Sequence, residues 1–146
     1  MKIHLETIIN RPFQQVATDF DRQLFEFLLP PKAVAKLVRY DGSNPGDIVH
    51  IRFRLPYGAD WISEIISRSE DHTKMEFVDI GTKLPLMLTK WHHRHMVDKV
   101  DDSNTRITDE MIFSTCCKLL DYLAYPVLFL AFYPRKKKYK LYFEGK

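Results

Sequence analysis

Alternating apolar and polar positions recur along most of the chain and predict a fold built mainly from strands. In residues 2–9, Ile3, Leu5 and Thr7 fall on one side of such a pattern. Successive side chains of a strand point to opposite faces, so this alternation is typical of a strand with one buried face. Similar patterns, separated by turn residues, predict four more strands at 33–40, 47–55, 59–68 and 74–80.

A first segment with helical spacing follows the N-terminal strand. Its apolar residues recur every three or four positions between Phe13 and Leu28, interrupted near Asp21. We expect two short helices, or one bent helix, with Asn10 as the cap and Pro12 in the first turn. Prolines at 30–31 should end this segment, because proline cannot continue a helix.

A second helical segment occupies residues 119–143. Leucines, Val127 and Ala131 recur there at a spacing that suits a long helix packed on a sheet. Pro126 and Pro134 lie inside it, so we expect either a kink or a late start of the helix.

The stretch 91–113 carries the candidate chemistry. It reads as two antiparallel strands joined by the polar turn 98–104. Pairing Val97 with Ile107 sets these further pairs opposite each other: His95 and Asp109, His93 and Met111, Trp91 and Phe113, Arg94 and Glu110. His93, His95 and Asp109 then share the apolar, inward face, where ionisable groups need an explanation.

These three residues, with Asp79 as a candidate fourth, allow three interpretations. They form a buried ion pair that fixes the hairpin or lines a pocket, which we favour. Alternatively His95, activated by Asp109, serves acid/base chemistry as the catalytic pair. Metal binding is the least favoured, because two histidines two apart on a strand need a third fixed ligand; we therefore predict no metal site.

Neighbouring strands add candidate pocket residues. Trp61 and Ser63 share one face of the 59–68 strand, and Phe77 and Asp79 share one face of the 74–80 strand. Mostly apolar walls with a few polar anchors are typical of ligand pockets, and equally of a filled core. The predicted ligand-binding set is Trp61, Ser63, Phe77, Asp79, Trp91, His93, His95, Asp109 and Met111.

Composition narrows the class of protein. The 146 residues fit a single domain spanning 1–146, with 45% hydrophobic and 28% charged residues. The net charge of +3 and the mixing of acids with bases argue against nucleic-acid binding. Cys116 and Cys117 are adjacent and cannot build a disulfide scaffold, and the N-terminal residues lack the apolar run of a signal peptide. A cytoplasmic location is expected.

The apolar run 118–133 precedes the basic residues 135–138. Lys118, Asp121 and Pro126 interrupt it, and a membrane-spanning helix needs about 20 apolar residues. We predict no stable membrane insertion and a docked helix with a solvated basic end.

The order of elements resembles the START/Bet v 1-like (SRPBCC) superfamily, in particular its bacterial polyketide-cyclase-like and cell-division-inhibitor-like members. The residues that carry the resemblance are Pro12, Phe13 and Val16, Leu29-Pro30, Tyr40-Asp41-Gly42, Pro45-Gly46-Asp47, Phe77 with Asp79, Pro85, and Trp91, His93 and His95 with Asp109. Leu84 and Met96 depart from the usual pattern. The resemblance implies an α+β helix-grip fold, in which a curved antiparallel sheet of about seven strands wraps a long C-terminal helix and two short helices follow the first strand.

The same resemblance implies a function. We expect a small hydrophobic or lipid-like molecule to bind in a cavity between the sheet and the C-terminal helix, without a cofactor. Two alternatives remain open: a cyclase/dehydratase-like enzyme that uses His95 and Asp109, and a protein-interaction module linked to cell division. The fold hosts both binding and catalysis, so it does not decide between them. The sequence makes no prediction of oligomeric state.

Overall fold

The computed structural model describes residues 1–54 and 58–145. The elements along the chain are β1 (Lys2–Ile9), α1 (Phe13–Thr18), α2 (Arg22–Leu28), β2 (Ala35–Tyr40), β3 (Ile48–Phe53), β4 (Ala59–Glu70), β5 (Lys74–Lys83), β6 (Leu88–Lys99), β7 (Thr105–Thr115), α3 (Lys118–Phe132) and α4 (Arg135–Glu144). The predicted strand at 47–55 is observed as β3, and its expected last residue, Leu55, lies outside the described residues.

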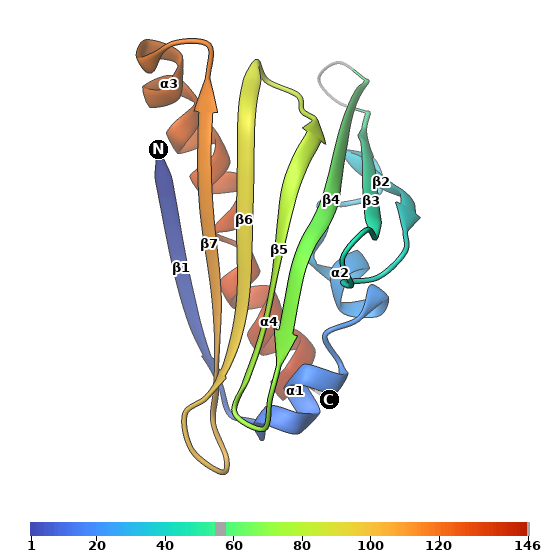
Figure 1. Ribbon diagram of the computed structural model, residues 1–146, viewed down its shortest axis with the longest axis vertical. Coiled ribbons are helices and arrows are strands. Elements are labelled where there is room, and N and C mark those ends of the chain that lie inside the picture. The colour runs from blue at the N-terminus through green and yellow to red at the C-terminus, as the bar shows by residue number, and fades with distance from the viewer. Residues whose placement is uncertain (55–57, 146) are drawn as a thin grey trace.

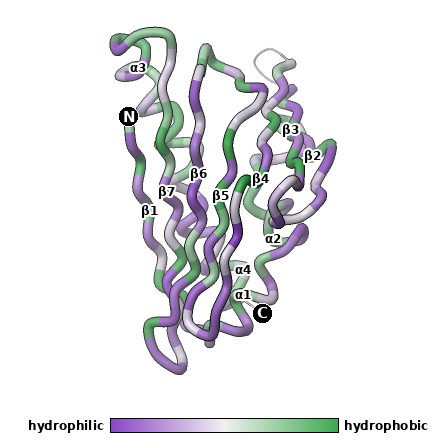
Figure 2. The backbone as a smooth tube through the Cα atoms, in the orientation of Figure 1, coloured by the Kyte–Doolittle hydropathy of each residue, from purple (hydrophilic) through white to green (hydrophobic). Residues whose placement is uncertain are grey.

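All the described strands form one antiparallel sheet with the order β1-β7-β6-β5-β4-β3-β2. Helices α3 and α4 run along one face of this sheet, and α1 and α2 lie near its β4 side (Figure 1). Hydrophobic and hydrophilic residues alternate along the strands (Figure 2), so that one face packs against the helices and the other faces solvent. This is the α+β fold, a sheet around a C-terminal helical segment, that the sequence predicts.

The register of the β6–β7 hairpin agrees with the predicted pairing. Val97 lies opposite Ile107, His95 opposite Asp109 and Trp91 opposite Phe113. One predicted side-chain contact is not made. Arg94 lies opposite Glu110, but its guanidinium donates hydrogen bonds to Glu76 on β5. Glu110 instead pairs with Lys2 on β1.

The N-terminal helical segment forms two helices. Asp21 caps α2, because its carboxylate accepts hydrogen bonds from the backbone N–H groups of Gln23 and Leu24. The expectation that Asn10 caps the first helix is wrong. Pro12 occupies the position before α1, and the backbone N–H of Asn10 donates to Glu144 in α4 instead.

The C-terminal helical segment breaks between α3 and α4, where Pro134 precedes the first residue of α4. The two halves pack differently. In α4, Tyr139 and Phe143 are fully buried, and the ammonium group of Lys138 donates to the backbone carbonyls of Leu28 and Leu29. The basic end is therefore only partly solvated, in contrast to the prediction, since one of its lysines ties α4 to the end of α2.

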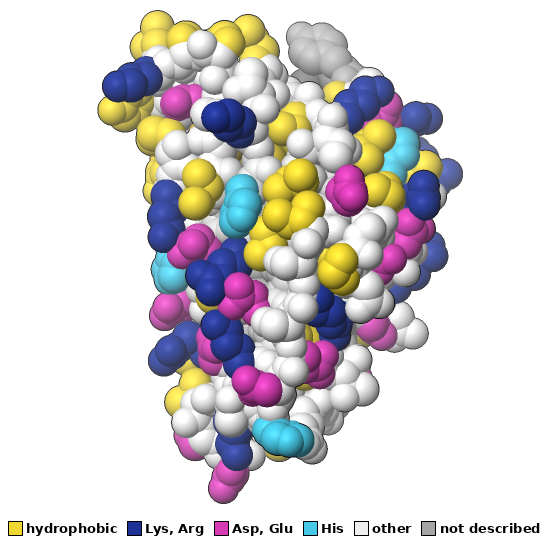
Figure 3. Space-filling model, viewed as in Figure 1, with side chains coloured by type: hydrophobic (Ala, Val, Ile, Leu, Met, Phe, Trp, Pro, Cys, Tyr) yellow, Lys and Arg dark blue, Asp and Glu magenta, His cyan; other side chains and the backbone are white. Residues whose placement is uncertain are grey.

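Helix α3 is the loosely packed half. Leu128 is its one fully buried side chain, whereas large apolar residues along its outer side are at least half exposed. These residues are Leu119, Tyr122, Leu123, Val127 and Leu130, and Tyr133 directly after the helix is also half exposed. Figure 3 shows hydrophobic side chains gathered at the end of the molecule where α3 begins. Among the described residues, no helix combines the length and apolar character that a membrane crossing requires.

Candidate functional site

Three adjacent strands bring four ionisable side chains together on the face covered by the helices. Asp79 comes from β5, His93 and His95 from β6, and Asp109 from β7. The register places Asp79 directly opposite His93, and His95 directly opposite Asp109. All four side chains are buried. We call these four residues the His–Asp cluster.

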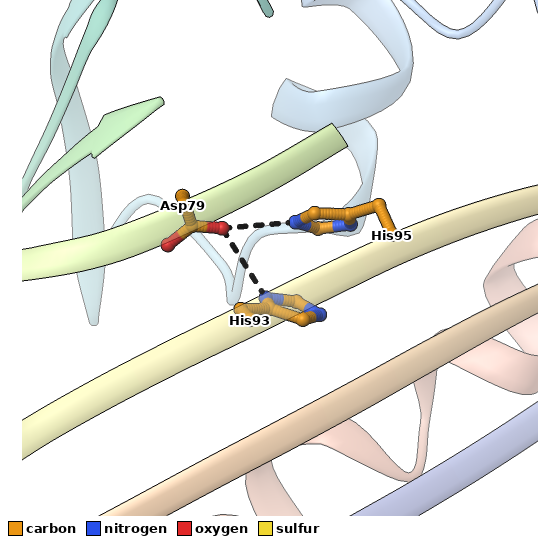
Figure 4. Close-up of side chains that lie close together, drawn as sticks. All are labelled: Asp79, His93 and His95. Atoms are coloured by element: carbon orange, nitrogen blue, oxygen red, sulfur yellow. Dashed lines mark hydrogen bonds and ion pairs between the residues drawn. The ribbon is translucent and has the colours of Figure 1, made fainter. Parts of the chain in front are cut away.

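Each carboxylate in the cluster approaches both imidazole rings. Asp79 Oδ2 lies 3.1 Å from His95 Nε2 and 3.6 Å from His93 Nδ1 (Figure 4). Asp109 Oδ1 lies 2.9 Å from His93 Nε2 and 3.2 Å from His95 Nδ1. The last approach is not aligned as a hydrogen bond, so that His95 Nδ1 is buried without a hydrogen-bond partner among the described residues. One carboxylate thus faces one nitrogen of each ring, and the second carboxylate faces the other nitrogens.

Two further hydroxyl groups complete the cluster. The hydroxyl of Tyr139 in α4 donates to Asp109 Oδ2 at 3.1 Å, and the hydroxyl of Ser63 on β4 helps to lower the pKa of Asp79. Ser63 belongs to the predicted pocket set, but Tyr139 does not. The sequence analysis missed it because Tyr139 sits within a basic run; its apolar spacing with Phe143 on one side of α4 is the signal that marks it as buried.

The two histidines differ in their acidity. Burial, together with the charge of His95, lowers the pKa of His93 to about 4. Burial also opposes protonation of His95, but the nearby carboxylates of Asp109 and Asp79 outweigh it and raise the pKa of His95 above its ordinary value. The two rings therefore favour different protonation states within a single cluster.

The remaining groups stay in the forms that this arrangement requires. Burial would raise the pKa of Asp109, but its hydrogen bond to His93 and the nearby ring of His95 hold it well below the ordinary range. The same balance, with His95 as the main partner, lowers the pKa of Asp79. Burial and the charge of Asp109 raise the pKa of the Tyr139 hydroxyl well above 10, so this hydroxyl keeps its proton and donates it. Two carboxylates therefore remain ionised inside an apolar interior.

Aromatic rings enclose the cluster on both sides. Phe77 stacks on His95 with ring centroids 4.3 Å apart, and Phe20 meets the same imidazole edge-on. On the other side, the ring centroids of Trp91 and Phe132 each lie 5.7 Å from the ring centroid of His93. Phe132 belongs to α3, so the loosely packed helix covers one side of the site.

The structure places every predicted site residue in the interior. Trp61, Ser63, Phe77, Trp91 and Met111 are all buried together with the cluster. Trp61 and Trp91 meet edge-to-face with centroids 4.6 Å apart, and the Trp61 indole N–H donates to Ser63. The predicted residues thus form one continuous wall from β4 to β7.

Two surface pockets lie away from this wall. One, of about 310 Å³, is lined by residues of α1 and the β4–β5 turn; the other, of about 300 Å³, is lined by residues around α2 and β2. Neither is bordered by a predicted site residue. Aromatic rings lie against both histidines of the cluster, and an open cavity there stays a prediction.

Comparisons with known proteins give a fold but no closer relative. No family model matches the sequence, and no curated protein matches it either. Among solved structures, norcoclaurine synthase from Thalictrum flavum, in complex with dopamine and hydroxybenzaldehyde, is 19% identical with a TM-score of 0.70, covering 100% of this chain and 88% of the other.

Two other solved structures agree. A hypothetical protein from Helicobacter pylori is 15% identical with a TM-score of 0.72, over 98% of this chain and 88% of the other. Ara h 8.0201 is 16% identical with a TM-score of 0.64, and the match covers 100% of this chain and 99% of the other. The chain therefore has the Bet v 1-like helix-grip fold that the sequence resemblance implies.

Proposed function

We propose that this protein binds a small hydrophobic or lipid-like molecule between its sheet and its C-terminal helices, with the His–Asp cluster as the polar anchor. The observation that carries the proposal is the burial of two ionised carboxylates and two imidazoles within an aromatic wall. Burying charge is costly, and well-packed apolar residues of similar volume often give equal or greater stability. A group of polar residues inside apolar walls is what a ligand pocket requires.

Helix α3 supplies the route by which a ligand enters. It contributes one fully buried side chain, Leu128, against two in α4, and its other core contacts come from partly buried residues. Its N-terminal end lies beside the β5–β6 loop, because Leu88 pairs with Thr115 just before α3 begins. In that loop, Leu86 and Met87 are exposed and both have positive φ, a strained conformation for such residues. The ligand enters between this loop and α3.

Both tryptophans of the chain lie in the proposed binding wall, which makes intrinsic fluorescence a direct test. Fatty acids of graded length and aromatic polyketides are titrated while the emission of Trp61 and Trp91 is followed. Native mass spectrometry, compared with the denatured mass, detects a ligand retained on purification. Saturable emission changes or a retained adduct are expected; a clean mass together with unchanged emission across the panel would contradict the proposal.

Acid/base catalysis is the second candidate, and the different acidities of His93 and His95 favour it. Paired groups whose pKa values are pushed apart are characteristic of acid/base sites. In this candidate, His95 exchanges a proton with a bound substrate while Asp109 and Asp79 orient its ring. His95→Asn should then abolish turnover and leave ligand affinity nearly intact, whereas loss of affinity alone would assign the residue to binding.

A further inference from the structure

The arrangement of nitrogens around Asp79 has the form of a metal site. Asp79 Oδ2, His95 Nε2 and His93 Nδ1 converge, and one ligand atom from each residue lies within 4.8 Å of the others. The ligand atoms of tetrahedral zinc lie about 3.3 Å from one another, since each bond is about 2.0–2.1 Å long. The observed separations of 3.1 and 3.6 Å from Asp79 bracket that value.

We propose that Asp79, His93 and His95 bind a divalent transition-metal ion, with zinc as the test ion. The obstacle for two histidines on one strand is the lack of a third fixed ligand. The neighbouring strand supplies it, because the β5–β6 register puts Asp79 directly opposite His93. Two imidazoles and one carboxylate are a ligand set that zinc and similar ions accept, with a further coordination position left open.

Asp109 supports this site from behind. Metal-bound histidines usually donate their second ring N–H to a carboxylate, which fixes the orientation of the ring. Asp109 Oδ1 faces His93 Nε2 at 2.9 Å and His95 Nδ1 at 3.2 Å, the nitrogens that point away from Asp79. Tyr139 then holds the other oxygen of Asp109. A single carboxylate therefore orients both histidines.

The charge of the cluster and an unpaired polar atom within it also favour a bound cation. Metal coordination requires neutral imidazoles. The carboxylates of Asp79 and Asp109 would then leave two formal negative charges in the interior, which a divalent cation would neutralise. His95 Nδ1 is buried without a hydrogen-bond partner among the described residues.

This inference goes beyond the proposed function and does not rest on it. The protein, freed of affinity tag and of apolar ligands, is stripped with chelator and then dialysed against zinc or cobalt(II). Because the site is buried, a second sample is unfolded and refolded in the presence of the ion, which removes any barrier to entry. Retained metal is counted by elemental analysis, and cobalt adds visible absorption bands that report low-coordinate geometry.

We expect one retained zinc per chain and a melting temperature that rises with zinc concentration. Asp79→Asn and His93→Gln, each checked for folding by circular dichroism, should lose the retained metal. His50→Asn is the matched control, since His50 and Asp60 form another histidine–carboxylate pair in the same sheet, at 2.8 Å. This control should still retain one ion.

Two results would overturn the proposal. The first is substoichiometric metal on the wild-type protein by both routes, a result that decides the matter even if neither variant folds. The second is a folded Asp79→Asn protein that holds as much zinc as wild type. Since no apolar ligand is present, either result leaves the ligand-binding proposal intact, and failure of the fluorescence titration leaves this one intact.

Discussion

The hydroxyl of Tyr139 donates a hydrogen bond to Asp109 and thereby ties helix α4 to strand β7, the neighbour of the edge strand β1. Both groups are buried, and the carboxylate also faces the two histidines of β6. Docking of the C-terminal helix and completion of the His–Asp cluster are therefore one structural event.

Tyr139→Phe tests this tie. The substitution keeps the ring and removes one hydrogen bond to a buried charged group, so it should lower the free energy of unfolding by about 1.5–3 kcal/mol. Urea denaturation followed by circular dichroism measures the change. Tyr122→Phe, at a largely exposed position of α3, is the control and should be neutral. Equal stability of the two variants would show that the hydroxyl adds nothing.

Asp109→Ala tests the buried charge itself. Removing the carboxylate leaves two buried imidazoles and the Tyr139 hydroxyl without their shared partner, and should cost about 3–5 kcal/mol. Thermal melting should show a marked drop. Asp102→Ala removes a carboxylate whose side chain is 94% exposed and should leave the melting curve almost unchanged. A wild-type melting curve for Asp109→Ala would refute a stabilising role of the cluster.

Glu76 makes stability depend on acid pH. Hydrogen bonds from Arg94 lower its pKa from 4.5 to about 2 in the folded protein. The unfolded chain therefore takes up this proton first, so the contribution is complete above about pH 4.5 and is lost as pH falls toward 2. Solvent screening limits it to about 1 kcal/mol. Glu76→Gln should be less stable at neutral pH and lose less stability on acidification; parallel pH profiles for both proteins would contradict this.

Hydrogen exchange should distinguish the two C-terminal helices. Amides of α3 should exchange faster than those of α4, because α3 buries one side chain fully and α4 is held by Tyr139, Phe143 and the Lys138 bonds. Mass spectrometry of peptides covering each helix gives the comparison. A bound apolar ligand should slow exchange in α3 more than in α4. Equal protection of both helices would remove α3 as the route of entry.

The alternation of residues was sufficient to predict the strands and the register of the β6–β7 hairpin. A one-residue shift there would turn His93, His95, Val97 and their partners toward solvent, so the apolar face allows only one pairing. This is why the opposition of His95 and Asp109 could be derived before the structure. The opposition of Asp79 and His93 was not predicted, because the sequence pattern ended one strand at Ile80 and began the next at Trp91 and therefore fixed no register between them.

The helical contacts were less accessible to sequence reasoning. Tyr139 and Lys138 lie in a basic run, and charge suggested a solvated end, whereas packing against β1 and α2 buries one and pairs the other with carbonyl groups. Asn10 has the chemistry of a helix cap, but its backbone is held by Glu144 from the far end of the chain. In these cases the local structure depends on a contact with a residue far away in the sequence, and the local sequence pattern does not predict such contacts.

The order of strands in the sheet also determines an order of assembly. β5, β6 and β7 follow one another as hairpins, so the strands that carry Asp79, His93 and Asp109 meet through short loop closures. β1 instead pairs with β7 and joins Lys2 to Ile112 across most of the chain. Contacts between distant residues form late, because closing a long loop costs entropy before any contact is gained. We therefore expect the site-bearing strands to form early and the N-terminal strand to complete the sheet last.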